Sequence, residues 1–207
     1  MHRLISSLLF VSAAFGQWEI GADIGYGWYR NGTIFGPGVS AHGGVRNRFA
    51  AGLIVAQQAN GYISGEFRYL FHDGHPFLEL PGIKQDIQGQ SHTLTYELLF
   101  HLNPSESRVR PFVAGGAGAK GYIVVGPEPF PQPIREIGTL VTNDVWKVVF
   151  SVGGGVKFRL HRRVAARVEF RDYLTTFPRG QIVPAANTTA RGIFQQFTPL
   201  FGLSYLF

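Results

Sequence analysis

Apolar and polar residues alternate with a period of two along most of this chain. In the last eleven residues, 197–207, every second position from Phe197 to Phe207 is aromatic, leucine or proline. A second run, 18–29, alternates Trp18, Ile20 and other apolar residues with glycine and acidic residues. A β-strand places successive side chains on opposite faces, so this period predicts strands with one apolar face and not amphipathic helices.

Eight such runs cover the chain after its first residues. Each is about 9 to 15 residues long, and a strand that crosses a bilayer at a tilt needs about 9 to 11. Residues 40–46 could form a ninth strand, but Gly43, Gly44 and weak alternation assign them to a loop. The eight predicted strands are residues 18–29, 49–57, 62–71, 91–102, 110–122, 146–160, 164–174 and 197–207.

The connections between these runs alternate between short and long. Asn60-Gly61, in the first short connection, is a strong hairpin signal. Short turns at one end and long loops at the other are typical of an outer-membrane barrel, with the turns in the periplasm and the loops outside the cell. The short connections are 58–61, 103–108 and 161–163, and the long ones are 30–48, 72–90, 123–145 and 175–193.

Alternation alone does not decide which face of the strands points outward. A soluble barrel of the lipocalin type would hide the aromatic face and expose the charged one. Two features favour a membrane barrel: charges lie in the middle of strands, and aromatic residues lie at both ends. Trp18, Tyr205 and Phe207 fall at one predicted interface, and Trp28 and Trp146 at the other, as in the aromatic girdles of membrane barrels.

With the apolar face outward, the predicted interior carries five acidic and seven basic side chains. An eight-stranded barrel is only wide enough for its own side chains, and a buried charge is costly unless it is paired. The near balance predicts a mutually neutralised plug, while the two spare cations leave open a narrow pore that weakly favours anions. The predicted interior charges are Glu19, Asp23, Glu66, Arg68, Glu97, Arg110, Lys120, Lys157, Arg159, Arg167, Glu169 and Arg171.

The N-terminal residues and the composition indicate an exported protein. Residues 1–16 combine a basic start, a short apolar run and small residues at the end, which predicts a cleaved signal peptide. Residues 17–207 then form one barrel domain. The absence of cysteine excludes a disulfide-stapled secreted domain. The formal net charge is +6 without a polybasic tract, so we expect no nucleic-acid partner.

Catalysis by this chain has weak support in the sequence. A serine hydrolase needs a nucleophile, a base and an orienting group close together. Ser91 with His92, and His101 with Glu97, are the only suggestive sets, and no serine is suitably placed beside His101. We expect His101 to be an interior residue near the turns, within the charge network. The prediction is therefore no catalytic residue.

Cofactor and metal sites are not predicted either. Gly116, Gly118 and Gly121 satisfy G-x-G-x-x-G, but a dinucleotide site needs a helix after the glycines, and the proline-rich segment that follows cannot form one. His72 and His75 lie in His-Asp-Gly-His, where a solvated loop is a simpler interpretation than a metal site.

Several segments resemble the bacterial outer-membrane β-barrel domain family, of the small OmpA-barrel and OmpX type. The resemblance implies an eight-stranded barrel inserted by the assembly machinery of the outer membrane, among lipid and lipopolysaccharide. That machinery reads a C-terminal strand ending in Phe, which here implies Phe201, Leu203, Tyr205 and Phe207. The segments that carry the resemblance are 64–69, 110–113 with the glycine-rich 115–118, 153–158, 168–173 and the terminal strand.

The long loops are the remaining candidate for function, because binding is often built on loops held by a rigid scaffold. The predicted function is a non-enzymatic, monomeric outer-membrane barrel with a structural role or a surface role through adhesion, ligand or lipopolysaccharide contact. A narrow pore and a lipid-modifying enzyme are the alternatives. The candidate loop residues are Phe35, Phe77, Phe130, Ile134, Phe177, Ile182, Arg30, Arg46, Arg135, Arg179 and Arg191.

Overall fold

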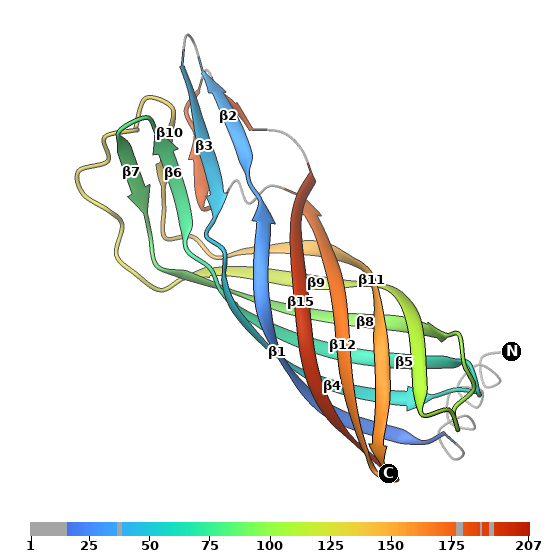
Figure 1. Cartoon of the computed structure of the whole chain (residues 1–207). Coiled ribbons are helices and arrows are strands. Elements are labelled where there is room, and N and C mark those ends of the chain that lie inside the picture. Colours follow the sequence, from blue (N-terminus) through green and yellow to red (C-terminus); the bar gives the residue numbers. More distant parts are fainter. Residues whose placement is uncertain (1–15, 37–38, 177–179, 187, 191–192) are drawn as a thin grey trace, which may run out of the picture.

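A computed structural model describes residues 16–36, 39–176, 180–186, 188–190 and 193–207. Within these residues, eight long antiparallel strands close into a barrel (Figure 1), which confirms the predicted fold class. The strands follow one another around the wall in chain order, and the last closes the barrel against the first. The barrel strands are β1 (Trp18–Arg30), β4 (Arg48–Gln58), β5 (Ile63–Asp73), β8 (Gly89–His101), β9 (Val109–Val124), β11 (Val145–His161), β12 (Val164–Thr176) and β15 (Ile193–Leu206).

The strand boundaries differ from the predicted ones by a few residues. The largest difference is in β15, which begins at Ile193 because it pairs with Thr176 of β12 before the alternation becomes aromatic. The predicted signal peptide lies outside the described residues except for Gly16. Among the described residues, no helix is long and apolar enough to cross a membrane.

The outer wall of the barrel is apolar. Phe201 and Leu203 are each 60% exposed, and their neighbours across β15 and β1 alternate in the same way. We call the end with the short connections the turn end, and the opposite end the loop end. At the turn end the Phe207 amide donates to the Trp18 carbonyl at 2.9 Å, and Trp146 is exposed near the loop end. The soluble lipocalin-type alternative, which requires a charged outer face, is therefore wrong.

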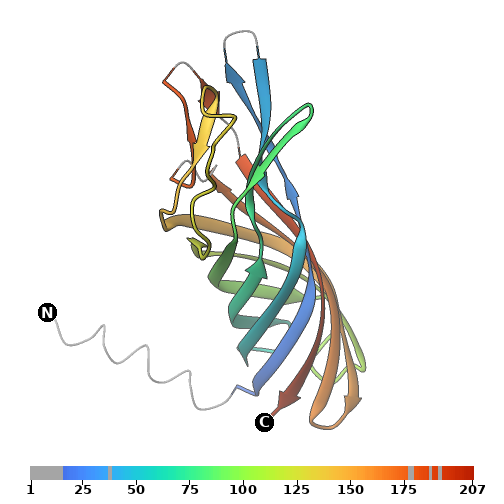
Figure 2. The same ribbon diagram turned by 90° about the vertical axis from the view of Figure 1, so that its left-hand side faces the viewer.

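The long connections are folded into a lobe above the loop end. Figures 1 and 2 show its strands standing beyond the barrel, on the side away from the C-terminus. Residues 40–46 lie outside the barrel as predicted, but most of them form a strand of this lobe. The loop lobe has a five-stranded sheet in the order β14-β2-β3-β6-β7 and a two-stranded sheet of β10 and β13. Its strands are β2 (Gly32–Gly36), β3 (Val39–Val45), β6 (Pro76–Leu80), β7 (Ile83–Asp86), β10 (Gly138–Leu140), β13 (Ile182–Pro184) and β14 (Thr189–Ala190).

A hydrophobic core joins the loop lobe to the mouth of the barrel. Ile34, Leu78 and Leu140 are fully buried in it. Tyr29 of β1 and Phe194 of β15 extend the same core into the barrel, with their rings stacked at a centroid distance of 5.1 Å. Burying apolar side chains is the main favourable term in folding, so these connections have a core of their own.

Candidate functional site

The barrel interior holds the predicted charges. Eleven of the twelve are buried, and the remaining one, Arg159, is half-buried at the turn end. Their burial follows from strand geometry. Along each strand the charged residues alternate with the exposed apolar residues, so the charged side chains point into the barrel. The interior is organised in three levels from the turn end to the loop end.

Glu169 is the hub of the central level. Its carboxylate accepts from Arg68 at 2.5 Å, from Arg171 at 2.9 Å and from Arg167 at 3.1 Å. All four side chains are no more than 1% exposed. Three guanidinium groups on one carboxylate need further anions, since like charges would otherwise repel in a medium of low dielectric constant.

Three further carboxylates supply that compensation. Asp23 accepts from Arg68 at 2.5 Å, and Glu97 lies 2.7 Å from Arg171. Glu66 contacts Arg68 at 2.7 Å and lies 3.8 Å from Arg171. Glu66 also accepts from Arg167 at 2.8 Å. The central level therefore has four carboxylates around three arginines, contributed by four of the eight strands.

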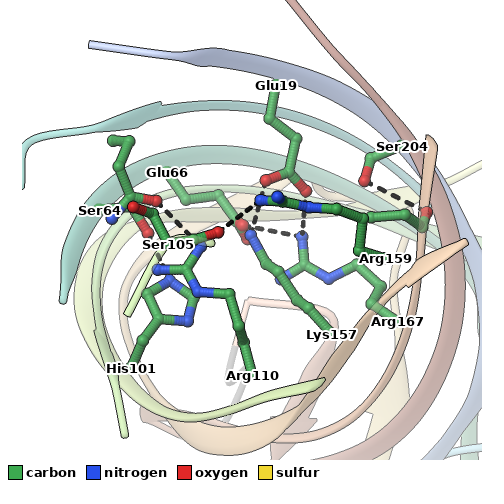
Figure 3. A network of polar contacts seen from close by, with 12 residues as sticks. Glu19, Ser64, Glu66, His101, Ser105, Arg110, Lys157, Arg159, Arg167 and Ser204 are labelled. Carbon is green, nitrogen blue, oxygen red and sulfur yellow. Dashed lines mark hydrogen bonds and ion pairs between the residues drawn. The ribbon is translucent and has the colours of Figure 1, made fainter. Parts of the chain in front are cut away.

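The turn end forms a small vestibule around Glu19 and Lys157, which pair at 2.7 Å. Among the described residues, Arg110 donates to neutral oxygens, the Gln58 amide at 3.1 Å and the Gly61 carbonyl at 3.2 Å. Figure 3 shows the side chains of Glu19, Lys157 and Arg110 converging on one interior space. The vestibule has a cavity volume of about 20 Å³, roughly the room that one water molecule needs.

Two other bases have surroundings that differ from the prediction. Arg159 donates to the Ser105 carbonyl oxygen. Lys120 lies near the loop end, where it donates to Gln196 and, at 3.2 Å, to the Tyr29 hydroxyl. No ion pair with a carboxylate is found for Arg110, Lys120 or Arg159 within the described residues. The sequence predicts a mutually neutralised plug with two spare cations, and these three bases lie outside the ion pairs of the described residues.

Two interior residues were missed or misassigned from the sequence. Phe112 is buried among the charges, with its ring centroid 5.5 Å from the Arg167 guanidinium and 5.6 Å from that of Arg171. Phe112 is two residues after Arg110 in the same strand, and this spacing could have indicated that its ring points into the barrel. His101 Nε2 and Ser64 Oγ form a hydrogen bond of 2.9 Å. His101 therefore lies near the turns as expected, but outside the ion pairs. The expectation that no serine is placed beside it is wrong.

The other candidates for catalysis do not come together. Ser91 faces the interior, 3.4 Å from the Tyr29 hydroxyl, whereas the adjacent His92 faces outward and contacts Tyr69 at 2.7 Å. Glu97 pairs with Arg171 rather than with His101. Among the described residues, Nδ1 of His101 has no hydrogen-bond partner, so no third group orients the Ser64 contact.

The His-Asp-Gly-His segment is not a solvated loop throughout. His72 is buried inside the barrel mouth and lies 3.3 Å from the Tyr29 hydroxyl, whereas His75 lies 3.5 Å from Asp73. No cluster of three or more potential metal ligands occurs in the described part of the chain.

The glycines of the G-x-G-x-x-G match lie in β9. A side chain on Gly116 or Gly118 would collide with the β8 backbone. Close approach of the two strands accounts for these two glycines.

The candidate loop residues divide into buried and exposed groups. Ile134, Ile182 and Phe77 belong to the buried interior of the loop lobe, which corrects the expectation that they are presented for recognition. Phe35 and Phe130 are exposed, at 65% and 97%.

The loop cations divide in the same way. Arg46 stacks on Phe77 at 4.2 Å and pairs with Glu79. Arg30 and Arg135 are exposed. Phe177, Arg179 and Arg191 lie outside the described residues.

One acidic side chain lies on the rim of the turn end. Glu106, in the turn between β8 and β9, is fully exposed. The Ser105 hydroxyl donates to it at 2.6 Å and lowers the pKa of the Glu106 carboxyl below its ordinary value. Glu106 is therefore an anion at neutral pH.

Solved structures with the same fold are outer-membrane proteins. The outer membrane protein OprG of Pseudomonas aeruginosa matches with a TM-score of 0.59 and 12% identity, over 93% of this chain and 96% of that one. Neisserial surface protein A matches with a TM-score of 0.57 and 13% identity, over 93% and 100%. The outer membrane protein AlkL matches with a TM-score of 0.54 and 17% identity, over 95% and 93%. No protein-family model and no curated protein matches the chain.

Proposed function

We propose that this chain, which has the eight-stranded fold of small outer-membrane β-barrels, is a monomeric integral outer-membrane protein with a surface role. Its outer wall supports membrane insertion, because it exposes a continuous apolar face that ends in aromatic residues. We infer that residues 17–207 form the mature barrel, with the turn end in the periplasm and the loop lobe outside the cell. Assembly through Phe201, Leu203, Tyr205 and Phe207 belongs to this proposal.

The interior charges act as a structural plug in this proposal. Arg68, Arg171 and Glu66 are 0% exposed, and each is held by two or more partners of opposite charge. Moving one of these groups to open a path would leave buried charges unpaired, at a cost of several kcal/mol. The central level therefore supports a barrel that does not conduct ions.

The folded loop lobe is the observation that carries the surface role. Loops that served only to connect strands would not need a five-stranded sheet and a common hydrophobic core. A rigid lobe presents side chains at low entropic cost, as binding surfaces require. The exposed Arg30 is two residues from the exposed Trp28 at the loop end of β1. Tryptophan marks the membrane interface in such barrels, where lipid phosphates lie, so we propose lipopolysaccharide as the contact.

This function is tested by binding of the whole refolded protein to vesicles that contain lipopolysaccharide. The double variant Arg30→Gln, Arg135→Gln is expected to release the vesicles at lower salt than the wild type, because two phosphate contacts are lost. Arg162→Gln, which removes one cation at the turn end, is the control. Identical salt dependence for the wild type and the double variant would overturn the proposed contact.

A narrow anion-favouring pore is the second candidate. The observation that favours it is the absence of a carboxylate partner for Arg110, Lys120 and Arg159 among the described residues. The pore would have to pass the central level, so replacing Arg167 or Arg171 by alanine should produce current steps. If neither variant gives discrete current steps in planar bilayers, the pore is ruled out.

A further inference from the structure

The vestibule at the turn end combines unneutralised cations with buried polar atoms that lack partners. Glu19 pairs with Lys157 through one oxygen, and its other oxygen lies 3.9 Å from Arg167. Among the described residues, the hydrogen bonds of Arg110 and Arg159 are to neutral oxygens. Glu106 on the rim accepts from the Ser105 hydroxyl and acts on Arg110 and Arg159 only at longer range, so three cations, Arg110, Lys157 and Arg159, face two carboxylates. The vestibule therefore has an excess of positive charge.

One buried donor in the vestibule lacks a partner. Among the described residues, Nε of Arg110 makes no hydrogen bond. Arg110 is 8% exposed, so bulk water does not simply solvate this atom. A buried donor without a partner costs about 1–3 kcal/mol, and a bound acceptor removes that cost.

We propose that this vestibule is a binding site for a phosphate group, free or carried by a small solute. An arginine guanidinium matches the oxygens of phosphate with paired N–H donors. Arg110 and Arg159 supply two guanidinium groups, and Ser64 supplies a hydroxyl at the wall of the vestibule. The cavity volume of about 20 Å³ is room for about one water molecule, so a phosphate does not enter it completely. The phosphate lies at the mouth, beside the half-buried Arg159, and the rest of the solute stays outside.

The site is separate from the central ion pairs and from the loop lobe. Its walls come from the ends of strands that meet at the short turns, including Gln17, Gln58 and Leu206. Binding there requires no passage through the barrel. Phosphate binding is therefore independent of the proposed contact with lipopolysaccharide.

The test is a titration of the whole refolded protein in uncharged detergent with inorganic phosphate, followed by calorimetry at constant ionic strength with chloride as the background anion. The wild type is expected to bind with saturation. Arg110→Gln and Arg159→Gln are each expected to weaken binding by about tenfold or more, the equivalent of one charged hydrogen bond. Arg162→Gln removes the same charge from the exposed surface of the same end and is expected to bind like the wild type.

Three results would overturn the proposal: no saturable binding by the wild type, equal weakening by all three variants, or unchanged binding by Arg159→Gln. Folding of each variant is checked by its heat-modifiable mobility on gels. In the described part of the chain, Arg159 hydrogen-bonds to a backbone carbonyl and is only half-buried, so its replacement tests the site even if Arg110→Gln does not fold. Arg159→Lys, which keeps the charge but loses the paired donors, is expected to bind more weakly than the wild type.

Discussion

Replacing Glu169 by glutamine removes the central anion of the barrel interior. The carboxylate accepts from Arg68, Arg167 and Arg171 at 2.5–3.1 Å. Glutamine has nearly the same size, so the packing is kept. Its amide group, however, places donor hydrogens where three guanidinium groups also donate, and at least one of them loses its acceptor.

The cost of this change follows from burial. Breaking a buried ion pair by removing one partner costs about 3–5 kcal/mol, because the other charge stays buried and unpaired. Solvent does not screen these charges and so does not lower this cost, because the four side chains are at most 1% exposed. With a urea dependence of about 2 kcal/mol per molar, the unfolding midpoint should fall by about 2 M.

The assay is equilibrium unfolding in urea of protein inserted in lipid vesicles, followed by tryptophan fluorescence and by gel mobility. Glu136→Gln is the matched control, because Glu136 lies exposed in the segment between β9 and β10, and its midpoint should equal that of the wild type. If Glu169→Gln unfolds at the same urea concentration as the control, the ion pairs do not stabilise the barrel and the reasoning is refuted.

Three other perturbations test different parts of the fold. Deleting Phe207, whose amide closes the barrel against β1, should lower the amount of protein in the outer membrane, and unchanged levels would contradict this. Gly118→Ala should lower the free energy of unfolding by about 1–3 kcal/mol, and with it the urea midpoint, because the new methyl group collides with the Leu94 carbonyl. Gly61→Ala should leave the midpoint unchanged, because Gly61 has open space around it. Leu78→Ala should cost the loop lobe about 2–5 kcal/mol and expose it to proteolysis while the barrel stays protease-resistant; equal resistance of lobe and barrel would argue against a separate core.

The barrel could be predicted from the sequence because strand periodicity is a local property. The parity that exposes Phe201 and Leu203 also decides which charges turn inward. All twelve predicted interior charges follow this parity, including those of β9, where glycine weakens the pattern. The prediction needed no information on which strand lies beside which.

The partners of these charges could not be predicted in the same way. Arg68 and Glu169 are 101 positions apart and meet because the tilt and stagger of a closed barrel bring distant strands to one level. Lys120 lies near the loop end because it is close to the last residue of β9, but its contact with Gln196 of β15 depends on the closed barrel. The fold of the loop lobe was missed for a related reason. Ile134 and Ile182 lie in short segments without alternation, and they reveal their burial only when the segments pair.

Single-channel recording in planar bilayers tests most directly whether the ion pairs close the barrel. The wild-type protein, inserted from detergent and verified as folded by heat-modifiable mobility, should give no discrete current steps in potassium chloride. Glu136→Gln should be equally silent. Discrete steps in the wild type, with a conductance that changes when Arg167 or Arg171 is replaced by alanine, would contradict a closed interior and establish a pore.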